Sequence, residues 1–398
     1  MWKTVKLGDV CQIQPKKAQV KARLKDSDEV SFMPMKELGI QNMHPKPTQT
    51  KKLEKVYSSY TYFEDNDILL AKITPCFENG KLGIASNLVN GVGFGSSEYI
   101  VLRCSEKVIP KYIYFCLNQS SFRTAGKNQM SGAVGHKRVP TEFIENTEIY
   151  LPPLAEQQRI VAKLDATFAE IDEAISVVEV KEIEVQKLKA SLLSSFFSDD
   201  TVMWRETTLG EHYDVRDGTH DSPKYIQDGF PLVTSKNLKN GKIDLTKVKY
   251  ISKEDYEDIN RRSGVSLGDV LMAMIGTIGN PVEIIEPPEF AIKNVALFKT
   301  NDEQSPAFLF YFLSHPHTIS KMMADAKGAT QKFVGLGYLR SFPILVPPLE
   351  VQEQIVEKLK AVYAEVENAN ESILKIKTNY QTLKSATLTQ ELQPSEAA

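Results

Sequence analysis

The sequence predicts an α+β protein in which two mixed α/β globular domains stand in tandem repeat, each followed by a long helix. Three observations predict this architecture: one phrase of sequence occurs twice, two long segments lack Gly and Pro, and those segments carry a heptad pattern of apolar residues. The 398 residues, 42% hydrophobic and 25% charged, are typical of a globular chain with room for two or three domains.

The repeat is clearest in "LPPLAEQQRIVAKL", which begins at Leu151, and "VPPLEVQEQIVEKL", which begins at Val346. Earlier phrases recur in the same order, as "DILLAKI" at Asp67 does in "DVLMAMI" at Asp269. The offset between copies changes from 202 to 195 residues, which indicates a duplication with changes in loop length. We therefore divide the chain into a first globular domain (residues 1–150), a first long helix (151–200), a second globular domain (201–345) and a second long helix (346–398).

The two segments without Gly or Pro, Leu154 to Asp200 and Leu349 to Gln393, predict unusually long helices. Two prolines precede each segment, and proline is accepted at the start of a helix but not in its interior. Apolar residues recur at spacings of four and three, with breaks in the first helix at Thr167 and Lys181 and none in the second. This is the pattern of a coiled-coil seam, so we expect the helices to pack together. The alternative is that each helix lies on its own domain. The seam positions are Ile160, Leu164, Ile171, Ala174, Val178, Val185, Leu188 and Leu192 in the first helix, and Ile355, Leu359, Val362, Val366, Ala369, Ile373, Ile376, Tyr380 and Leu383 in the second.

Short apolar runs punctuated by Gly, Asn and Pro predict strands within the globular domains. These runs are "DILLAKI" (67–73), "SEYIVLRC" (97–104), "DVLMAMIGTIG" (269–279) and "NVALFKT" (294–300). The phrases "PKYIYFCL" (110–117) and "PAFLFYFLSH" (306–315) predict a short buried helix in each domain. The glycine cluster "GVGFG" (91–95) predicts a turn between strands rather than a cofactor loop.

The sequence carries none of the motifs of common catalytic sites. It has no P-loop, no H-E-x-x-H, no G-x-S-x-G, and no N-P-P-F/Y-like loop for a flipped adenine. The four cysteines form no C-x-x-C pair, so we expect reduced core thiols rather than metal ligands or disulfides. His315 and His317 are predicted to lie at a solvent-facing helix end. We therefore expect a chain that binds something and does not itself catalyse a reaction.

Charge is divided between the globular domains and the helices. Residues 1–150 carry 21 Lys and Arg against 15 Asp and Glu, a net charge of +6, whereas residues 151–200 carry −5. Residues 201–345 carry −1 and residues 346–398 carry −3. This division is compatible with globular domains that face phosphate and helices that face protein. Small basic clusters such as Lys16-Lys17, His136-Lys137-Arg138 and Arg261-Arg262 suit nucleic acid, although each could also be an ordinary solvated surface.

The repeated phrases resemble the specificity subunit of type I restriction-modification enzymes. The resemblance covers essentially the whole chain, and it lies in the doubled "PPLAEQQ" and "PPLEVQEQ", in "DGTHDSP" (217–223), in "GDVLMAMIGTIGN" (268–280) and in "GATQKF" (328–333) with the "LRSFPILVPPLE" that follows. It implies that each globular domain is a target recognition domain for one half of an asymmetric, bipartite site in double-stranded DNA. It also implies that the helices form an antiparallel coiled coil, which spaces the half-sites and docks two methyltransferase subunits.

The resemblance further implies a non-catalytic subunit of a complex that also contains restriction and translocase subunits. It implies no cofactor in this chain, with S-adenosylmethionine, ATP and Mg bound by the partner subunits. The chain departs from the family pattern in two places: the first domain has no D-G-T-H, and Val351 stands where the first helix has Glu156. The first departure leaves the front loop of that domain unassigned, and the second leaves open whether both helix starts dock partners equally.

The loops and helix starts that carry the resemblance supply the candidate contacts. In such a domain Lys and Arg contact phosphate, and Asn, Gln, His, Ser and Arg contact base edges. The candidate DNA-binding residues are Lys16, Lys36, Lys72, Asn128, Gln129, His136, Lys137, Arg138, Thr219, His220, Lys224, Lys236, Asn237, Gln331 and Lys332. The candidate partner-binding residues are Leu154, Gln157, Arg159, Leu349, Gln352 and Gln354. Each loop residue could instead only cap a turn or meet solvent.

Two functions from other classes stay open. One is a self-sufficient DNA-modifying enzyme, which the missing motifs disfavour; the other is a non-catalytic two-headed protein adaptor that does not bind DNA. No stretch approaches the roughly 18 uninterrupted apolar residues of a membrane span, and the start "MWKTVKLGDV" has no signal-peptide pattern. We therefore expect a cytoplasmic protein with no membrane partner.

Overall fold

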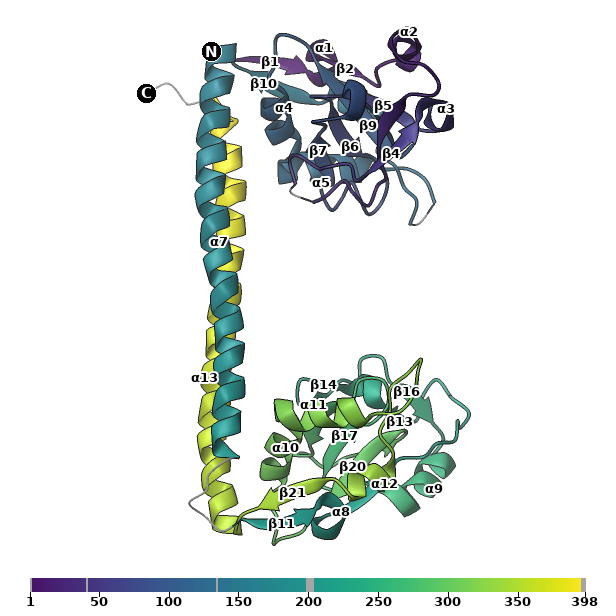
Figure 1. Cartoon of the computed structure of the whole chain (residues 1–398), viewed down its shortest axis with the longest axis vertical. Coiled ribbons are helices and arrows are strands. Elements are labelled where there is room, and N and C mark those ends of the chain that lie inside the picture. The colour runs from purple at the N-terminus through teal and green to yellow at the C-terminus, as the bar shows by residue number, and fades with distance from the viewer. Residues whose placement is uncertain (1, 41, 134, 198–203, 395–398) are drawn as a thin grey trace. The chain divides into compact units, whose positions relative to one another are not determined.

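The structure is a computed structural model that describes residues 2–40, 42–133, 135–197 and 204–394. The chain divides into two compact units, Met1–Val178 with Lys375–Ala398, and Glu179–Leu374. Each unit contains one globular domain and a part of both long helices, as the colours of Figure 1 show. The predicted boundary between residues 200 and 201 lies outside the described residues.

The globular domain of the first unit contains two four-stranded sheets. One sheet has the order β2-β9-β6-β7, with antiparallel neighbours throughout, and the other has the order β4-β3-β8-β5, with β3 and β8 parallel. The strands are β2 Cys11–Ile13, β3 Glu29–Met33, β4 Gln49–Lys52, β5 Thr61–Glu64, β6 Ile68–Ala71, β7 Leu82–Ile84, β8 Val92–Gly95 and β9 Tyr99–Cys104. The helices are α1 Leu7–Val10, α2 Val20–Arg23, α3 Leu53–Val56, α4 Pro110–Leu117, α5 Ser120–Gln129 and α6 Thr141–Asn146, with the 3-10 turns η1 Lys17–Gln19 and η2 Val89–Gly91.

Strand β9 shows how the apolar runs build this domain. Successive side chains of a strand point to opposite faces of the sheet. Ile100 and Leu102 therefore join the core beneath α4, whereas Tyr99 and Val101 join a second core with residues of β3 and β5. Both faces of β9 are buried, which explains why its sequence is an uninterrupted apolar run rather than an alternating one.

The globular domain of the second unit repeats this plan with smaller sheets. Its four-stranded sheet, β12-β20-β17-β18, matches β2-β9-β6-β7, and it is accompanied by the sheets β16-β13-β19 and β14-β15. The strands are β12 Asp214–Asp217, β13 Phe230–Val233, β14 Leu238–Lys239, β15 Lys242–Ile243, β16 Lys249–Ile251, β17 Val270–Ala273, β18 Gly279–Glu283, β19 Ala291–Ile292 and β20 Val295–Lys299. The helices are α8 Leu209–His212, α9 Lys253–Ser263, α10 Pro306–Ser314, α11 Pro316–Asp325 and α12 Leu336–Arg340, with the 3-10 turn η3 Ser235–Asn237.

A separate two-stranded sheet joins the two ends of each globular domain. In the first unit β1 (Lys3–Lys6) pairs antiparallel with β10 (Glu148–Leu151). In the second unit β11 (Arg205–Thr208) pairs in the same way with β21 (Pro343–Val346). The Pro-Pro phrase follows β10 and β21 directly, so each long helix begins where its domain is closed.

The long helices are α7 (Leu154–Phe196) and α13 (Leu349–Glu391), and both begin at the predicted residue. In the first unit Lys163 Nζ lies 2.7 Å from Glu391 Oε1, and Asp172 pairs with Lys384. In the second unit Gln186 Nε2 donates to Asn370 Oδ1 at 3.2 Å. In the same unit Lys189 lies over the ring of Tyr363. Residue numbers thus rise along α7 as they fall along α13 in both units, so the helices are antiparallel and the predicted fold class is confirmed.

The predicted seam between the helices is correct only in part. Ile160, Leu164 and Leu359 are buried, but Leu188 is 58% exposed. Lys189, the residue after Leu188, instead places its ammonium 3.9 Å from the centre of the Tyr363 ring. Ile376 and Leu383 are likewise exposed, whereas Lys384 lies over the Phe168 ring at 5.2 Å. Long Lys side chains can cover apolar surface along their methylene stems, which a count of apolar positions does not register.

Most predicted local elements are present. The four apolar runs contain β6, β9, β17 and β20, and the two phrases of buried helix form α4 and α10. The prediction for "GVGFG" is wrong, because residues 92–95 form strand β8 inside a sheet and not a turn. A Cβ on Gly93 would lie 2.2 Å from Phe63 Cε2, so the glycine is needed for packing of the sheet against Phe63. Within the described ranges, no helix is both long and apolar enough to cross a bilayer.

Candidate nucleic-acid interface

Each globular domain carries a hairpin that extends the end of its central strand. In the first unit Ser131 and Arg138 exchange two backbone hydrogen bonds, with N···O distances of 3.1 and 2.9 Å. The Thr74 N–H, just beyond β6, donates to Lys137 O at 2.9 Å. In Figure 1 this segment, between α5 and α6 in sequence, projects as a loop from the body of the domain.

The second unit repeats the hairpin with the same hydrogen-bond pattern. Lys327 and Phe333 exchange two backbone hydrogen bonds of 3.0 and 2.8 Å. The Gly276 N–H, just beyond β17, donates to Lys332 O at 2.8 Å. The two hairpins therefore match residue by residue at their second strand.

This match assigns equivalent positions in the two domains. Lys137 corresponds to Lys332, and Arg138 corresponds to Phe333. Gly132 and Gly328 correspond as well, with φ values of +125° and +100°, which favour glycine over other residues. The first hairpin is one residue longer between its paired ends.

The hairpin of the first unit brings several predicted residues together. His136, Lys137 and Arg138 are all exposed, and the Val139 N–H that follows them donates to Lys72 O at 2.9 Å. Asn128 and Gln129 are exposed at the end of α5, directly before the hairpin. The fold therefore places Lys72 beside a basic cluster that is about 65 residues away along the chain.

One carboxylate, that of Glu98, lies within this basic cluster. Arg138 Nε and Nη2 donate to Glu98 Oε2 and Oε1 at 2.9 and 2.7 Å. The hydrogen bonds from Arg138 lower the pKa of Glu98, and the charges of Lys72 and His136 act in the same direction. Glu98 therefore stays ionised at neutral pH and raises the pKa of Arg138 in turn.

Two predicted residues of the first unit lie apart from the hairpin contacts. Lys16 lines an open cleft of about 440 Å³ together with Lys17, Tyr57, Tyr60 and Tyr62. Lys36 is exposed beyond β3, and no hydrogen bond or ion pair among the described residues joins it to the hairpin. Both stay predictions.

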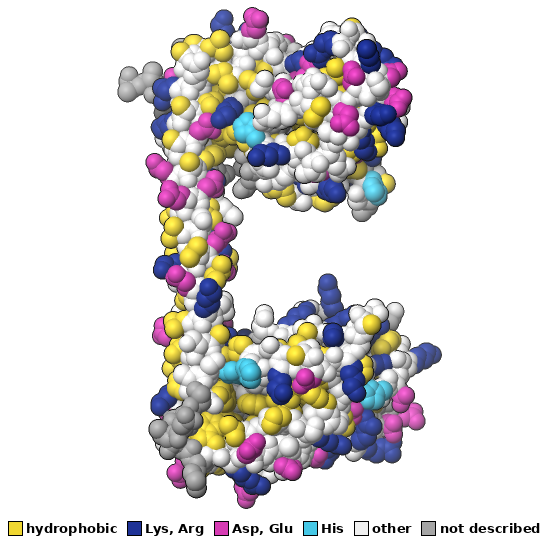
Figure 2. All heavy atoms as spheres, viewed as in Figure 1, with side chains coloured by type: hydrophobic (Ala, Val, Ile, Leu, Met, Phe, Trp, Pro, Cys, Tyr) yellow, Lys and Arg dark blue, Asp and Glu magenta, His cyan; other side chains and the backbone are white. Residues whose placement is uncertain are grey.

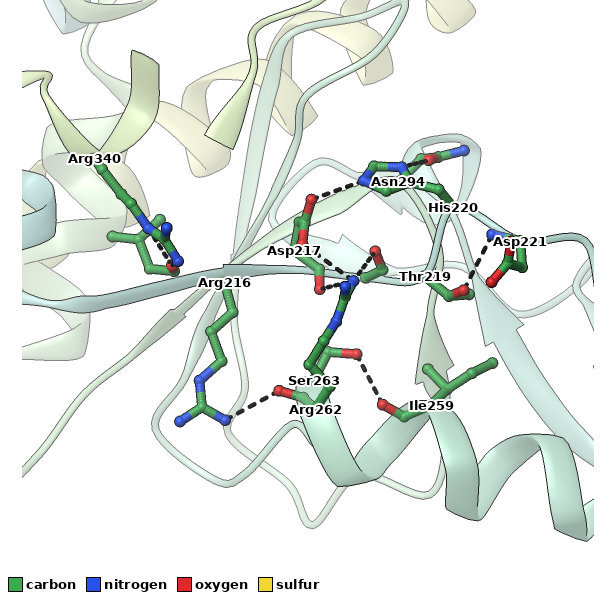
Figure 3. A network of polar contacts seen from close by, with 12 residues as sticks. Arg216, Asp217, Thr219, His220, Asp221, Ile259, Arg262, Ser263, Asn294 and Arg340 are labelled. Carbon is green, nitrogen blue, oxygen red and sulfur yellow. Dashed lines mark hydrogen bonds and ion pairs between the residues drawn. The ribbon is translucent and has the colours of Figure 1, made fainter. Parts of the chain in front are cut away.

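The D-G-T-H loop of the second unit is held by the network in Figure 3. His220 lies between two side chains, with Nε2 2.9 Å from Asp217 Oδ2 and Nδ1 2.7 Å from Asn294 Oδ1. The Thr219 N–H donates to Ile292 O at 3.0 Å, and Arg262 Nη2 lies 3.3 Å from Asp217 Oδ1. Asp217 is buried, whereas the His220 side chain is 60% exposed, so the loop is fixed while its imidazole meets solvent.

Glu98 and Asn294 are functional candidates that sequence reasoning missed. Each is the residue directly before an equivalent strand, β9 or β20. Glu98 holds Arg138 in the first unit and Asn294 holds His220 in the second. No motif marks either residue, and only the matching place of β9 and β20 in the two four-stranded sheets shows that the two positions are equivalent.

The remaining predicted residues of the second unit fall into two groups. Lys224, Lys236, Gln331 and Lys332 are exposed and stay predictions. Asn237 differs from its prediction because it is buried. Its Nδ2 donates to Asp244 O at 2.9 Å, and its Oδ1 accepts from the Thr234 N–H at 2.9 Å. The amide therefore closes a loop within the chain and has almost no surface to offer DNA.

The helix starts also differ from their prediction at two positions. Gln157 and Gln352 are buried, with 0% and 2% of their surfaces exposed, and each amide hydrogen-bonds its own unit. Both therefore fasten the helix to the globular domain in place of the predicted contact with a partner. The other four candidates, which stay predictions, are Leu154, Arg159, Leu349 and Gln354.

The two helix starts differ as the sequence suggests. Arg159 Nη2 pairs with Glu156 Oε1 at 2.8 Å on the surface of α7, and this lowers the pKa of Glu156. Val351, which takes the place of Glu156 in α13, packs against the core of the second unit. At this position one helix start carries a surface ion pair and the other carries an apolar side chain that packs against the core.

Charge of both signs is spread over the surface. Figure 2 shows Lys and Arg side chains interspersed with Asp and Glu side chains over the visible face of each globular domain and along the visible part of the helices. Within the described residues, no group of three or more His, Cys, Asp or Glu side chains is arranged to hold a metal ion. The geometry offers two matching hairpins, one in each globular domain, with exposed Lys side chains at equivalent positions.

Comparison with known proteins gives consistent results. A family model described as "Type I restriction modification DNA specificity domain" matches the chain twice, at residues 1–180 and 203–378. The type I restriction enzyme EcoAI specificity subunit of Escherichia coli is 33% identical over 220 residues, which is 54% of this chain and 36% of that protein. The MjaVIII specificity subunit of Methanocaldococcus jannaschii is 24% identical over 388 residues, 91% of this chain and 86% of that protein. The alignment with the EcoAI subunit thus spans about a third of that relative's length.

Solved structures share the fold at low sequence identity. A chain from work on complex assembly and conformational transition of the type I R-M system has a TM-score of 0.77 and 20% identity, and covers 98% of this chain and 97% of itself. The HsdS subunit from Thermoanaerobacter tengcongensis has a TM-score of 0.55 and 19% identity, with 98% and 96% coverage.

Proposed function

The chain belongs to the specificity-subunit family of type I restriction-modification systems, and we propose that it selects the DNA sequence on which such a complex acts. In this proposal each globular domain is a target recognition domain that binds one half of a bipartite site. The observation that carries the proposal is the pair of matching hairpins, one in each domain, on a common backbone pattern with different side chains. Different side chains on the same scaffold favour two different half-sites, and hence an asymmetric site.

The residues of the hairpins and of the D-G-T-H loop suit the two kinds of contact that specific DNA binding needs. Lys137 and Lys332 stand at equivalent exposed positions and have the chemistry for phosphate. Arg138, His220 and Gln331 offer donors and acceptors of the kind that read base edges in the major groove. Phosphate contacts would set the position of each domain on the duplex, and the base contacts would select the sequence.

We further propose that the chain is a non-catalytic member of a larger complex. Two methyltransferase subunits would dock on the exposed surface of α7 and α13, and restriction and translocase subunits would join them. S-adenosylmethionine, ATP and Mg would be bound by those partners, because no catalytic motif occurs in this sequence. The same proposal includes a cytoplasmic location, where the DNA substrate and these cofactors are available.

The test is a map of adenine methylation in genomic DNA. A host without its own methylation receives the gene for this chain with the gene for its neighbouring methyltransferase, and the control host receives the methyltransferase alone. The proposal expects a split, asymmetric motif that appears only when this chain is present. If methyltransferase expression is verified and no new motif appears, the proposal is overturned. Salt-dependent binding of the chain to a duplex then decides whether it is a protein adaptor that does not bind DNA.

A further inference from the structure

We propose that Arg138 reads a guanine in the half-site of the first recognition domain and that Glu98 positions the guanidinium for this contact. The inference rests on the proposed function, because it takes double-stranded DNA as the ligand. It deepens that function by assigning one base and two side-chain roles.

The Arg138 side chain is held in place within the chain itself. Its Nε and Nη2 donate to the two carboxylate oxygens of Glu98 at 2.9 and 2.7 Å, and its Nη1 donates to the backbone oxygen of His136 at 3.0 Å. The side chain of Arg138 is nevertheless 46% exposed, against 22% for Glu98. A side chain that is fixed before binding loses less conformational entropy when it binds, which favours a specific contact.

The donors that remain on Arg138 match one base edge. A guanidinium has five N–H donors, and the contacts of the described residues use three of them. One donor therefore remains on each of Nη1 and Nη2. Guanine presents two neighbouring acceptors, O6 and N7, in the major groove, and a bidentate contact from Arg to these atoms is the commonest base-specific contact in DNA complexes.

Glu98 makes a base a better ligand than a phosphate at this position. Its ionised carboxylate neutralises the charge that would attract a phosphate and would itself repel the phosphate oxygens. The base edge is uncharged, so it is not repelled in this way. Lys137 is the contrasting neighbour, because no carboxylate within the described part of the chain lies at ion-pair distance from it. We therefore assign Lys137 to phosphate and Arg138 to the base.

The second domain provides an internal comparison. Phe333 occupies the position equivalent to Arg138 and is 40% exposed, but its ring has no donor. Asn294 replaces Glu98 and faces His220 instead. Reading of guanine at this hairpin position is therefore a property of the first domain alone, and Phe333 is the matched site for a control.

The experiment uses the full-length chain in complex with its methyltransferase partner. The wild type, Arg138→Ala, Arg138→Lys, Glu98→Gln, Lys137→Ala and Phe333→Ala are compared by genomic methylation mapping. Binding is also measured on the mapped duplex and on duplexes with each base pair of the half-sites replaced in turn. Melting temperatures and the motif of the unaltered half-site show whether each variant folds and assembles.

We expect Arg138→Ala and Arg138→Lys to lose about tenfold in discrimination at one G·C pair of one half-site, with the other half-site unchanged. Lysine keeps the positive charge but lacks the two parallel N–H donors of the guanidinium, so it should not restore discrimination between bases. Glu98→Gln should relax the same base pair more weakly without lowering the melting temperature, whereas a merely structural role would lower the melting temperature and leave base preference intact. Lys137→Ala should weaken binding to all DNA sequences alike. Phe333→Ala should change base preference only in the other half-site.

The outcomes separate this inference from the function on which it rests. A wild-type complex that gives no motif overturns both. A wild-type motif combined with unchanged guanine preference in Arg138→Ala overturns the inference alone. The inference is also overturned if Arg138→Ala weakens every duplex equally and Arg138→Lys restores binding, because that result identifies a phosphate contact.

Discussion

Gln157 Oε1 accepts a hydrogen bond of 2.9 Å from the backbone N–H of Ile109, at the start of α4. Its Nε2 donates to the carbonyl oxygens of Lys107 and Pro152 at 3.0 and 2.9 Å, so one buried amide joins α7 to the globular domain. Gln352 repeats part of this arrangement, since its Oε1 accepts from the Ser305 N–H and its Nε2 donates to Pro347 O. Gln157 and Gln352 therefore each attach a long helix to the globular domain that precedes it.

The first prediction concerns this attachment. Gln157→Ala removes the side-chain partner of three backbone groups, one of them buried, and should lower the free energy of unfolding of the first unit by about 2–3 kcal/mol. Hydrogen exchange of the Ile109 amide should accelerate accordingly. The matched control is Gln158→Ala, which changes the exposed neighbour and should stay within about 0.5 kcal/mol of the wild type. Equal protection of Ile109 in all three proteins would contradict the assignment.

The second prediction concerns the buried ion pair of the first domain. Arg103 Nη2 lies 2.7 Å from Asp67 Oδ2, and the Asp67 side chain is only 2% exposed. Arg103→Met leaves that carboxylate buried without its partner and should destabilise the unit by about 3–5 kcal/mol at neutral pH. Arg23→Met is the control, because Arg23 pairs with Glu64 at the surface and should contribute about 1 kcal/mol or less.

The loss of stability in Arg103→Met, relative to the wild type, should become smaller as pH falls. Burial raises the pKa of Asp67 above its ordinary value, and Arg103 opposes this shift, so its removal raises the pKa further. A folded-state pKa above the unfolded value means that the folded protein takes up the proton first as pH falls. Stability of the variant relative to wild type should therefore rise between pH 7 and pH 5. Hydrogen exchange of β6 and β9 at both pH values measures it, and a constant difference would contradict the sign.

The third prediction concerns a histidine that joins α7 to α11. His315 is buried, its Nδ1 accepts from the His317 N–H at 3.1 Å, and its Nε2 lies 3.1 Å from Ser194 Oγ. Burial lowers the pKa of His315, and the neighbouring His317 acts in the same direction. The folded-state pKa of His315 lies below its unfolded value. The stabilisation of the second unit by neutral His315 is therefore fully present above about pH 6.5 and is lost as pH falls.

Below pH 6.5, titration of His315 should lower the free energy of unfolding of the second unit by at most about 1.4 kcal/mol per pH unit. His315→Asn keeps a side-chain acceptor for the His317 N–H but does not titrate, so its stability should depend less on pH in this range. Thermal unfolding of both proteins between pH 7.5 and pH 5.5 measures the difference. Parallel curves for the two proteins would show that His315 is not the titrating group.

The fourth prediction concerns the length of the helices. Four residues, about one turn and about 6 Å of rise, are inserted between Val178 and Glu179 of α7 and between Leu374 and Lys375 of α13. If the helices space the half-sites, the unread gap of the methylated motif should lengthen by one or two base pairs, given about 34 Å for each turn of about 10 base pairs. An insertion in α7 alone breaks the pairing register and is expected to abolish the motif. An unchanged gap in the double insertion would mean that the helices are not the spacer.

The fold could be predicted from the sequence where local chemistry determines it. Prolines and the absence of Gly mark the start of α7 and α13, and uninterrupted apolar runs mark β9 and β20. What could not be predicted depends on partners distant along the chain. Gln157 is buried because backbone groups of residues 107 and 109 meet it, and no pattern around residue 157 records their position.

The candidate site shows the same limit. Lys137 and Arg138 were identified as a basic cluster from their own sequence, yet Glu98, which fixes Arg138, lies 40 residues away. His315 and His317 were expected at a solvent-facing helix end. His317 is exposed, but His315 is buried beside Ser194 and Phe197. Asn237 has a residue type suited to base contacts, and only the fold reveals that both ends of its amide are already used.

The two-stranded sheets β1-β10 and β11-β21 have a consequence for how such genes change over generations. Each globular domain enters and leaves through one pair of strands, with Lys3 opposite Leu151 in the first and Arg205 opposite Val346 in the second. Similar PPL phrases follow both exits, so the two domains are joined to their helices in the same way. Two crossovers, one near each strand of a pair, would exchange one globular domain between alleles and leave both long helices unchanged. If each globular domain reads one half-site, as proposed, such an exchange would change one half-site in one event, without the many point mutations that remodelling a hairpin would require.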